Sequence, residues 1–133
     1  ATICLILASG DRPLDFHSRA VLNDQLLSTS GIDDHHIFPA KFLEDRGFDS
    51  RQRDCVLNRC LIDSATNQRI SCSAPSAYMA ELRDEPGFPM QAVLSSHLIP
   101  HGPESGLWSD DDERFLQQRQ ELVAAAIEKA CSG

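Results

Sequence analysis

The spacing of apolar residues predicts helices in the N-terminal quarter of the chain. Residues 1–9 are apolar at helix-compatible positions, and the stretch Gly10-Asp11-Arg12-Pro13 ends that pattern. A weaker helical periodicity runs over residues 16–28 and stops at a Ser-Thr-Ser-Gly turn. We therefore expect two helices before residue 31.

The pattern changes in the middle of the chain. Residues 32–38 lie between Gly31 and Pro39, too few for a helix, so we expect a strand that carries two adjacent histidines. The elements expected after it are a helical turn (40–43), a charged loop (45–54), a returning strand in the second half of 56–62, a loop or N-cap region (63–66) and a short helix (67–70).

The C-terminal half again has helical spacing. Pro75 in a first turn predicts a helix over residues 76–83, and another is expected over 90–98 before Pro100. Ser109 is expected to cap a long amphipathic helix, with four acidic residues in its first turn. Its expected buried stripe consists of Phe115, Leu116, Leu122, Val123, Ala126 and Ile127.

Length and composition favour one folded domain. The chain has 133 residues, of which 41% are hydrophobic, so a modest core can form. The longest apolar run, Ile3 to Ala8, is too short to span a bilayer, and no membrane association is expected. Because the chain starts at Ala1 without a methionine, we interpret residues 1–133 as a single domain excised from a longer protein.

The cysteine pattern favours a reducing compartment, the cytoplasm. The five cysteines are odd in number and form no Cys-x-x-Cys pair, which argues against a secreted disulfide framework. Cys55, Cys60 and Cys72 could form a three-thiolate zinc cluster, but buried reduced thiols are the preferred interpretation.

Charge is distributed unevenly. The formal net charge of −8 argues against a free-standing nucleic-acid-binding protein. Residues 35–83 carry seven basic and six acidic groups, whereas residues 84–133 carry three basic and nine acidic groups. The segment with the histidine pair is thus the one that best tolerates a phosphate backbone.

His35, His36, Asn58 and Asn67 form the candidate chemical site. Phosphodiester hydrolysis needs a base for the attacking water and a cation that neutralises charge, and histidine and a divalent metal suit these tasks. Adjacent residues of a strand point to opposite faces, so one histidine can hold the metal while the other acts as the base if the strand bends or ends there. Individually, the histidines also fit a surface turn or a structural zinc site, Asn58 a turn and Asn67 a helix cap.

The order of these residues resembles the HNH endonucleases, also called ββα-metal or His-Me finger nucleases. The segments that carry the resemblance are His35-His36-Ile37-Phe38-Pro39, Leu57-Asn58-Arg59, Asn67-Gln68-Arg69-Ile70-Ser71 and Ala74-Pro75-Ser76. Similar order occurs in the HNH domain of CRISPR RNA-guided nucleases. The sequence looks more like the C-terminal nuclease domain of GmrSD-type modification-dependent restriction proteins and of phosphorothioate-sensing phage-defence proteins.

The resemblance implies an α+β fold with a ββα-metal core over residues 32–83, a helical C-terminal extension over 87–131, and N-terminal helices around the core. It implies a metal-dependent DNA endonuclease that acts as the effector of a bacterial restriction or phage-defence protein. A ParB-like nucleotide-hydrolysing sensor domain would precede it in the full-length protein.

The resemblance also implies residue roles. His36 matches the general base, Asn58 the central asparagine of the catalytic motif, and His35 and Asn67 the metal ligands. Mg²⁺ is the expected ion, with Mn²⁺ or another transition metal as alternatives, because many relatives have Asp where this chain has His35. The candidate DNA-phosphate contacts are Lys41, Arg59 and Arg69. The alternative function is a catalytically silent DNA-binding or protein-docking domain with the same fold.

Overall fold

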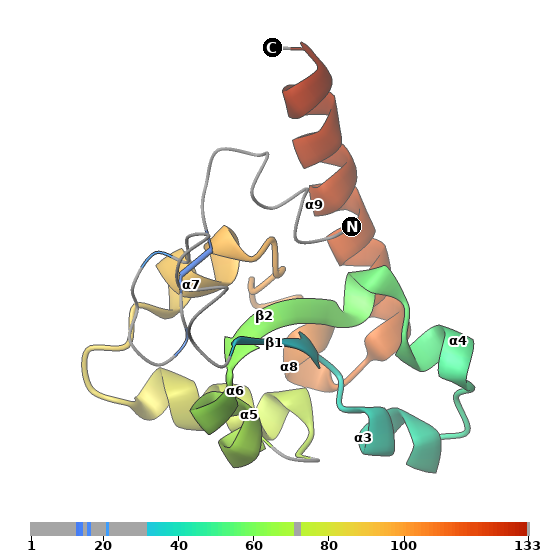
Figure 1. Ribbon diagram of the computed structural model, residues 1–133, viewed down its shortest axis with the longest axis vertical. Helices are drawn as coiled ribbons and strands as arrows, with labels where there is room; N and C mark the ends of the chain where they lie inside the picture. The colour runs from blue at the N-terminus through green and yellow to red at the C-terminus, as the bar shows by residue number, and fades with distance from the viewer. Residues whose placement is uncertain (1–12, 15, 17–20, 22–31, 71–72, 133) are drawn as a thin grey trace.

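A computed structural model of the chain describes residues 13, 14, 16, 21, 32–70 and 73–132 (Figure 1). Within these ranges the side chains of residues 32–34, 62–65, 67 and 130 are not described. The helix expected over residues 1–9 lies outside the described residues, and so does Cys72. Of the helix expected over 16–28 only Phe16 and Val21 are described, and Val21 forms an isolated antiparallel bridge with Leu14, so the helix is wrong at that position.

The described chain combines helices with one small antiparallel sheet, which confirms the expected α+β class. Its elements in chain order are β1 (Ile32–His36), α3 (Ala40–Asp45), α4 (Ser50–Arg53), the 3-10 helix η1 (Val56–Asn58), β2 (Arg59–Asp63), α5 (Ser64–Ile70), α6 (Pro75–Asp84), α7 (Met90–Ser96), α8 (Gly106–Ser109) and α9 (Asp112–Ser132). The helices expected over residues 76–83 and 90–98 are present as α6 and α7.

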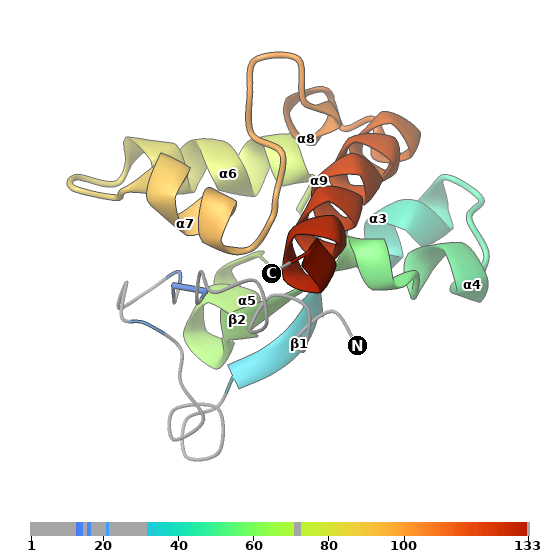
Figure 2. The ribbon, with the colours of Figure 1, turned by 90° about the horizontal axis from the view of Figure 1, so that it is seen from above.

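The sheet is a two-stranded ribbon that brings the two halves of the sequence motif together. β1 and β2 pair antiparallel, with His35 opposite Cys60 and His36 opposite Arg59. Helices α3 and α4 and the turn η1 form the connection between the strands, and α5 follows β2 directly. α5 lies against both strands (Figure 2). The two strands and the helix that follow one another in the sequence therefore also pack together in the fold.

Two segments expected to be loops are helical. The charged loop over residues 45–54 contains α4, because Asp49 accepts from the backbone N–H of Gln52 while the Gln52 side chain accepts from the Asp49 N–H. α5 begins at Ser64 and not at Asn67, so residues 64–66 are helical and not the loop or N-cap region expected over 63–66. Both errors come from short helices with little apolar periodicity.

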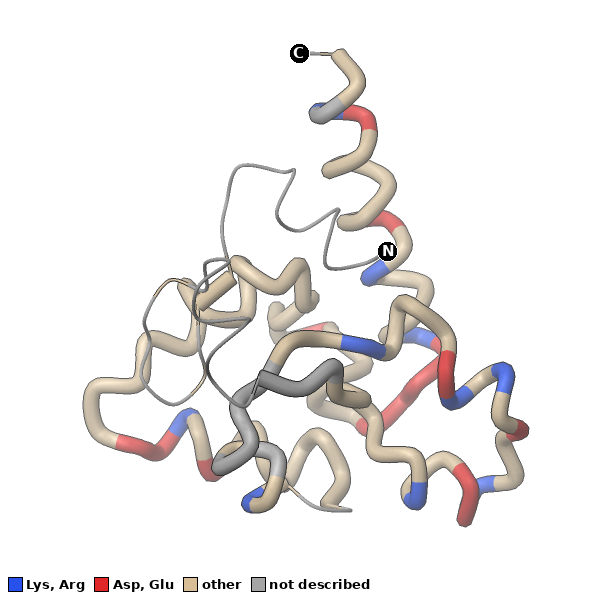
Figure 3. Tube along the Cα trace, in the orientation of Figure 1, with Lys and Arg blue, Asp and Glu red and all other residues tan. Residues whose placement is uncertain are grey.

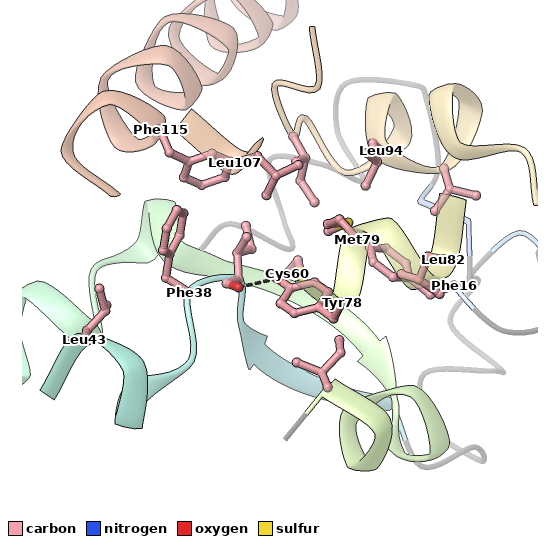
Figure 4. Packing of buried hydrophobic residues seen from close by; sticks show 14 residues of the cluster. Phe16, Phe38, Leu43, Cys60, Tyr78, Met79, Leu82, Leu94, Leu107 and Phe115 are labelled. Carbon is pink, nitrogen blue, oxygen red and sulfur yellow. Dashed lines mark hydrogen bonds between the residues drawn. The ribbon is translucent and has the colours of Figure 1, made fainter. Parts of the chain in front are cut away.

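The hydrophobic core joins the strand region to the C-terminal helices (Figure 4). Ile37 and Phe38, directly after β1, are buried, and the Phe38 ring lies 5.2 Å from the ring of Phe115 in α9. Tyr78 of α6 donates its hydroxyl hydrogen to the carbonyl of Ile37. Burial raises the pKa of the Tyr78 phenol well above its usual range, so the hydroxyl keeps the proton it donates.

The start of the last helix differs from the expectation. Ser109 is the last residue of α8, and Asp110 follows in the left-handed conformation with φ 56°. The side chain of Asp111 instead accepts from the backbone N–H of Arg114 at 3.2 Å, which makes Asp111 the cap of α9. Asp110 caps α6, since its carboxylate accepts from the backbone N–H and the hydroxyl of Ser76.

The buried stripe expected along α9 is present in part and ends at Val123. Phe115 and Val123 are buried, but Leu122 and Ile127 are each 40% exposed. In Figure 1 the second half of α9 rises away from the rest of the described chain. Across the described part of the chain, none of the helices has the length and apolar character needed to cross a membrane.

Candidate functional site

The two histidines occupy the last two positions of β1 and point to opposite faces of the ribbon. Residues directly opposite each other in an antiparallel pair share a face. His35 therefore lies on the face of Cys60, which is buried in the core, while His36 lies on the face of Arg59. The regular pairing confirms that the two imidazoles, on adjacent residues, lie on opposite faces of the ribbon. β1 ends at His36.

His36 is held by Asp54, a residue that the sequence motif does not single out. The Nε2 atom of His36 lies 2.8 Å from Oδ1 of Asp54, and the guanidinium of Arg59 lies 3.4 Å from the same oxygen. The hydrogen bond from His36 is the main cause that lowers the pKa of the Asp54 carboxyl, and the charges of Arg59 and Arg53 act in the same direction. Asp54 is therefore an ionised acceptor at neutral pH.

Asn58 ties together the backbone on both sides of this pair. Its Oδ1 accepts from the N–H of Phe38 at 2.8 Å, and its Nδ2 donates to the carbonyls of Phe38 at 3.1 Å and Arg53 at 3.0 Å. The side chain is almost fully buried. Phe38 lies two residues after His36, and Arg53 directly precedes Asp54. Asn58 thus ties the segment that follows His36 to the segment that carries Asp54.

Arg119 of α9 supports the same region from the opposite side. Its fully buried guanidinium donates to the carbonyls of Leu57 at 2.7 Å and Arg59 at 2.6 Å, which flank Asn58. It also donates to the carbonyls of His97 at 3.0 Å and Leu98 at 3.2 Å. One side chain therefore hydrogen-bonds both the turn from η1 into β2 and the backbone at the end of α7.

Sequence reasoning missed both Asp54 and Arg119. Asp54 lies in a stretch crowded with charges, and nothing in the sequence separates it from its neighbours. Arg119 gave a usable signal, because it stands four residues from Phe115 and four from Val123 and so shares their buried face of α9. A charged residue on a buried face needs hydrogen-bond partners, which makes such a position structural or functional.

The expected metal ligands are described only in part. Asn67 lies in α5, which rests on both strands, but its side chain is not described, and His35 is half-buried on β1. Within the described ranges, no group of three or more His, Cys, Asp or Glu residues is placed to hold a metal ion. The donor chemistry of His35 and Asn67, one imidazole and one amide oxygen, still suits a divalent cation that keeps open positions.

The three candidate phosphate contacts each lie beside an acid. The ion pairs join Lys41 to Asp45 at 3.0 Å, Arg59 to Asp54 at 3.4 Å and Arg69 to Glu85 at 3.5 Å. Figure 3 shows basic and acidic residues interspersed along the stretch that runs from α3 through α4. The surface around these candidates is therefore mixed in charge, and a phosphate would compete with the carboxylates for the basic groups.

Two cysteines of the three-thiolate alternative, and the histidine that follows α7, are also described. Cys55 and Cys60 are free thiols, while Cys72 lies outside the described residues, so the three-thiolate alternative stays untested. His97 is fully buried, with Nε2 at 2.8 Å from the Leu14 carbonyl and its ring against Phe16. His97 is also the C-terminal cap of α7.

Comparison with known proteins finds one distant relative. An uncharacterized protein of Methanocaldococcus jannaschii is 28% identical over 138 residues, an alignment that covers 88% of this chain and 23% of the relative. The chain thus spans about a quarter of the length of the curated relative it matches. No protein-family model matches the sequence, and no solved structure matches it.

Replacing Asn58 with alanine is expected to lower the free energy of unfolding by about 3 kcal/mol, because it leaves the buried N–H and carbonyl of Phe38 without this partner. Urea unfolding followed by circular dichroism measures the change. The control is Gln120→Ala on the exposed surface of α9, where we expect a change within about 0.5 kcal/mol. Equal stability of the two variants would show that the Asn58 clamp contributes nothing.

Proposed function

We propose that this chain is a metal-dependent DNA endonuclease domain of the HNH type, with His36 as the general base. The observation that carries the proposal is the His36–Asp54 pair at the end of β1, in a β1–β2–α5 unit whose connection is clamped by Asn58. An imidazole paired with a carboxylate is a common form of general base, since the carboxylate orients the ring and stabilises its protonated form.

The residues divide the work of phosphodiester hydrolysis. His36 takes a proton from the attacking water, and Asn58 keeps the backbone around His36 in place. His35 and Asn67 would hold a divalent ion, which when bound neutralises charge on the phosphate and on the leaving oxygen. Arg59 lies beside the His36–Asp54 pair and contacts Asp54. A phosphate that replaces Asp54 as the partner of Arg59 would therefore bind next to His36.

The biological setting follows from the resemblance alone. We propose that the domain acts on DNA as the effector of a restriction or phage-defence protein and that a ParB-like sensor domain supplies recognition. The net charge of −8 supports the need for such a partner, because it repels DNA overall. The alternative, a silent docking domain, is favoured by the acids beside Lys41, Arg59 and Arg69.

A plasmid-nicking assay separates these functions. We expect supercoiled plasmid to be nicked slowly in Mg²⁺ or Mn²⁺ and not in EDTA, with little dependence on sequence. The rate should fall steeply as salt rises, because the contacts to DNA are electrostatic. A folded chain that binds DNA or a partner but leaves the plasmid intact with either metal would favour the docking alternative.

Metal affinity is expected to depend on both proposed ligands. His35→Ala and Asn67→Ala should each weaken Mn²⁺ binding, measured by isothermal titration calorimetry, because the ligand set is small and nearly neutral. His35→Asp should shift preference towards Mg²⁺, since carboxylate is the harder ligand. Gln68→Ala, an exposed neighbour on α5, is the control. Unchanged affinity in both alanine variants would remove these residues from the metal site.

A further inference from the structure

The contact between His36 and Asp54 carries information about which ring nitrogen does the chemistry. We propose that Asp54 is a positioning residue that keeps the hydrogen of His36 on Nε2 and thereby makes Nδ1 the atom that accepts the proton from water. This inference rests on the proposed nuclease function, and it adds a residue that the HNH-like motif of the sequence does not contain.

The argument starts from hydrogen-bonding capacity. An ionised carboxylate only accepts hydrogen bonds, and a neutral imidazole has one nitrogen that donates and one that accepts. Oδ1 of Asp54 lies 2.8 Å from Nε2 of His36, so Nε2 must be the donor. The lone pair is then on Nδ1. Asp54 stays ionised because its pKa is lowered, chiefly by the hydrogen bond from His36.

The backbone around the pair is built to keep this geometry. Asp54 ends α4, where its own N–H donates to the carbonyl of Ser50 at 2.9 Å. Asn58 ties the carbonyl of Arg53 to the backbone of Phe38, so the segments that carry Asp54 and His36 cannot separate without breaking buried hydrogen bonds. Arg59 approaches the same carboxylate oxygen at 3.4 Å and limits its rotation.

The proton balance of the step is simple. Water transfers one proton to Nδ1 of His36 as its oxygen forms a bond to phosphorus, and the bond from phosphorus to the 3′ oxygen breaks. The resulting imidazolium is stabilised by the negative charge of Asp54, which takes no proton itself. The leaving 3′ oxygen takes a proton from solvent, and His36 returns to its neutral form by releasing its proton to solvent.

Nitrogen NMR of the His36 ring tests the tautomer without any metal or substrate. In ¹⁵N-labelled protein at about pH 8, where an ordinary imidazole is neutral, we expect one dominant tautomer with hydrogen on Nε2. A His36→Gln spectrum identifies the signals. Asp54→Ala should give a mixture of the two tautomers, whereas Asp84→Asn, which removes an exposed acid paired with Arg83, should leave the ring unchanged.

Nicking kinetics test the consequence. Asp54→Ala and Asp54→Asn should lower kcat by roughly 10- to 100-fold with little change in KM, because the base is misplaced and not removed. Asp54→Glu should recover part of the loss, since it restores a carboxylate. Asp54 is exposed, so the midpoint of thermal unfolding should change little, which excludes a loss of fold as the cause.

The outcomes separate the inference from the function. Cleavage that requires His36 but is unaffected in Asp54→Ala, with an unchanged ring tautomer, overturns the role of Asp54 and leaves the nuclease proposal standing. A wild-type chain that does not cleave with any divalent ion overturns the nuclease proposal, and with it the catalytic use of Asp54. A tautomer that shifts together with kcat supports the inference.

Discussion

His36→Ala is expected to lower the rate of plasmid nicking by roughly 100- to 10,000-fold, the range that a general base contributes. Of the described histidines, His97 is buried against Leu14 and Phe16, His101 bonds the carbonyl of Ile99, and His35 lies on the other face of the ribbon. None of them is placed to replace His36. The measurement is the initial nicking rate in Mg²⁺ and in Mn²⁺.

The fold should survive this substitution, because His36 is only half-buried and its bonding partner Asp54 is exposed. Circular dichroism and the thermal midpoint provide that check. His101→Ala, which removes a half-buried histidine outside the pair, is the matched control and should keep the wild-type rate. A folded His36→Ala protein that retains most of its nicking activity would mean that another group is the base.

Arg119→Met is expected to have the largest effect on stability, about 3–5 kcal/mol in the free energy of unfolding. Methionine keeps an unbranched apolar stem that reaches about as far as Nε, but it removes the donors to four backbone carbonyls, those of Leu57, Arg59, His97 and Leu98. For a chain of this size the loss corresponds to a fall of about 10–20 °C in the thermal midpoint. Scanning calorimetry or circular dichroism measures it.

Two further variants show what Arg119 contributes. Arg119→Lys should recover little of the loss, since one ammonium cannot match the planar fork that reaches carbonyls on two separate segments. Arg114→Met, on the exposed surface of the same helix, should change stability by no more than about 0.5 kcal/mol. Equal stability of the Arg119 and Arg114 variants would show that the four hydrogen bonds do not support the fold.

The two predictions are connected through the turn from η1 into β2. Arg119 bonds the carbonyls on both sides of Asn58, and Asn58 bonds the backbone next to His36 and Asp54. A milder substitution at Arg119 that leaves the chain folded should therefore also slow nicking. The C-terminal helix then acts on the site as a structural support, without touching the reacting atoms.

The sequence by itself determined the local elements and the motif. The short extended segment between Gly31 and Pro39 predicted β1, and the apolar spacing after Pro75 and up to Pro100 predicted α6 and α7. These predictions hold because the chain breakers and the apolar period act over a few residues. The separation of His35 and His36 onto opposite faces followed from the alternation of side chains in any strand.

Only the tertiary structure decided which distant residues meet. Asp54 is one acid among many in a charged stretch, and its choice of His36 depends on how α4 is placed against the ribbon. Leu122 and Ile127 are exposed because other described residues do not pack against α9 at these positions. The apolar periodicity of a helix predicts which face is apolar, but not how far along the helix that face is covered. Arg119 finds its carbonyl partners up to 62 residues away in sequence, on backbone that is brought to it by the packing of the core.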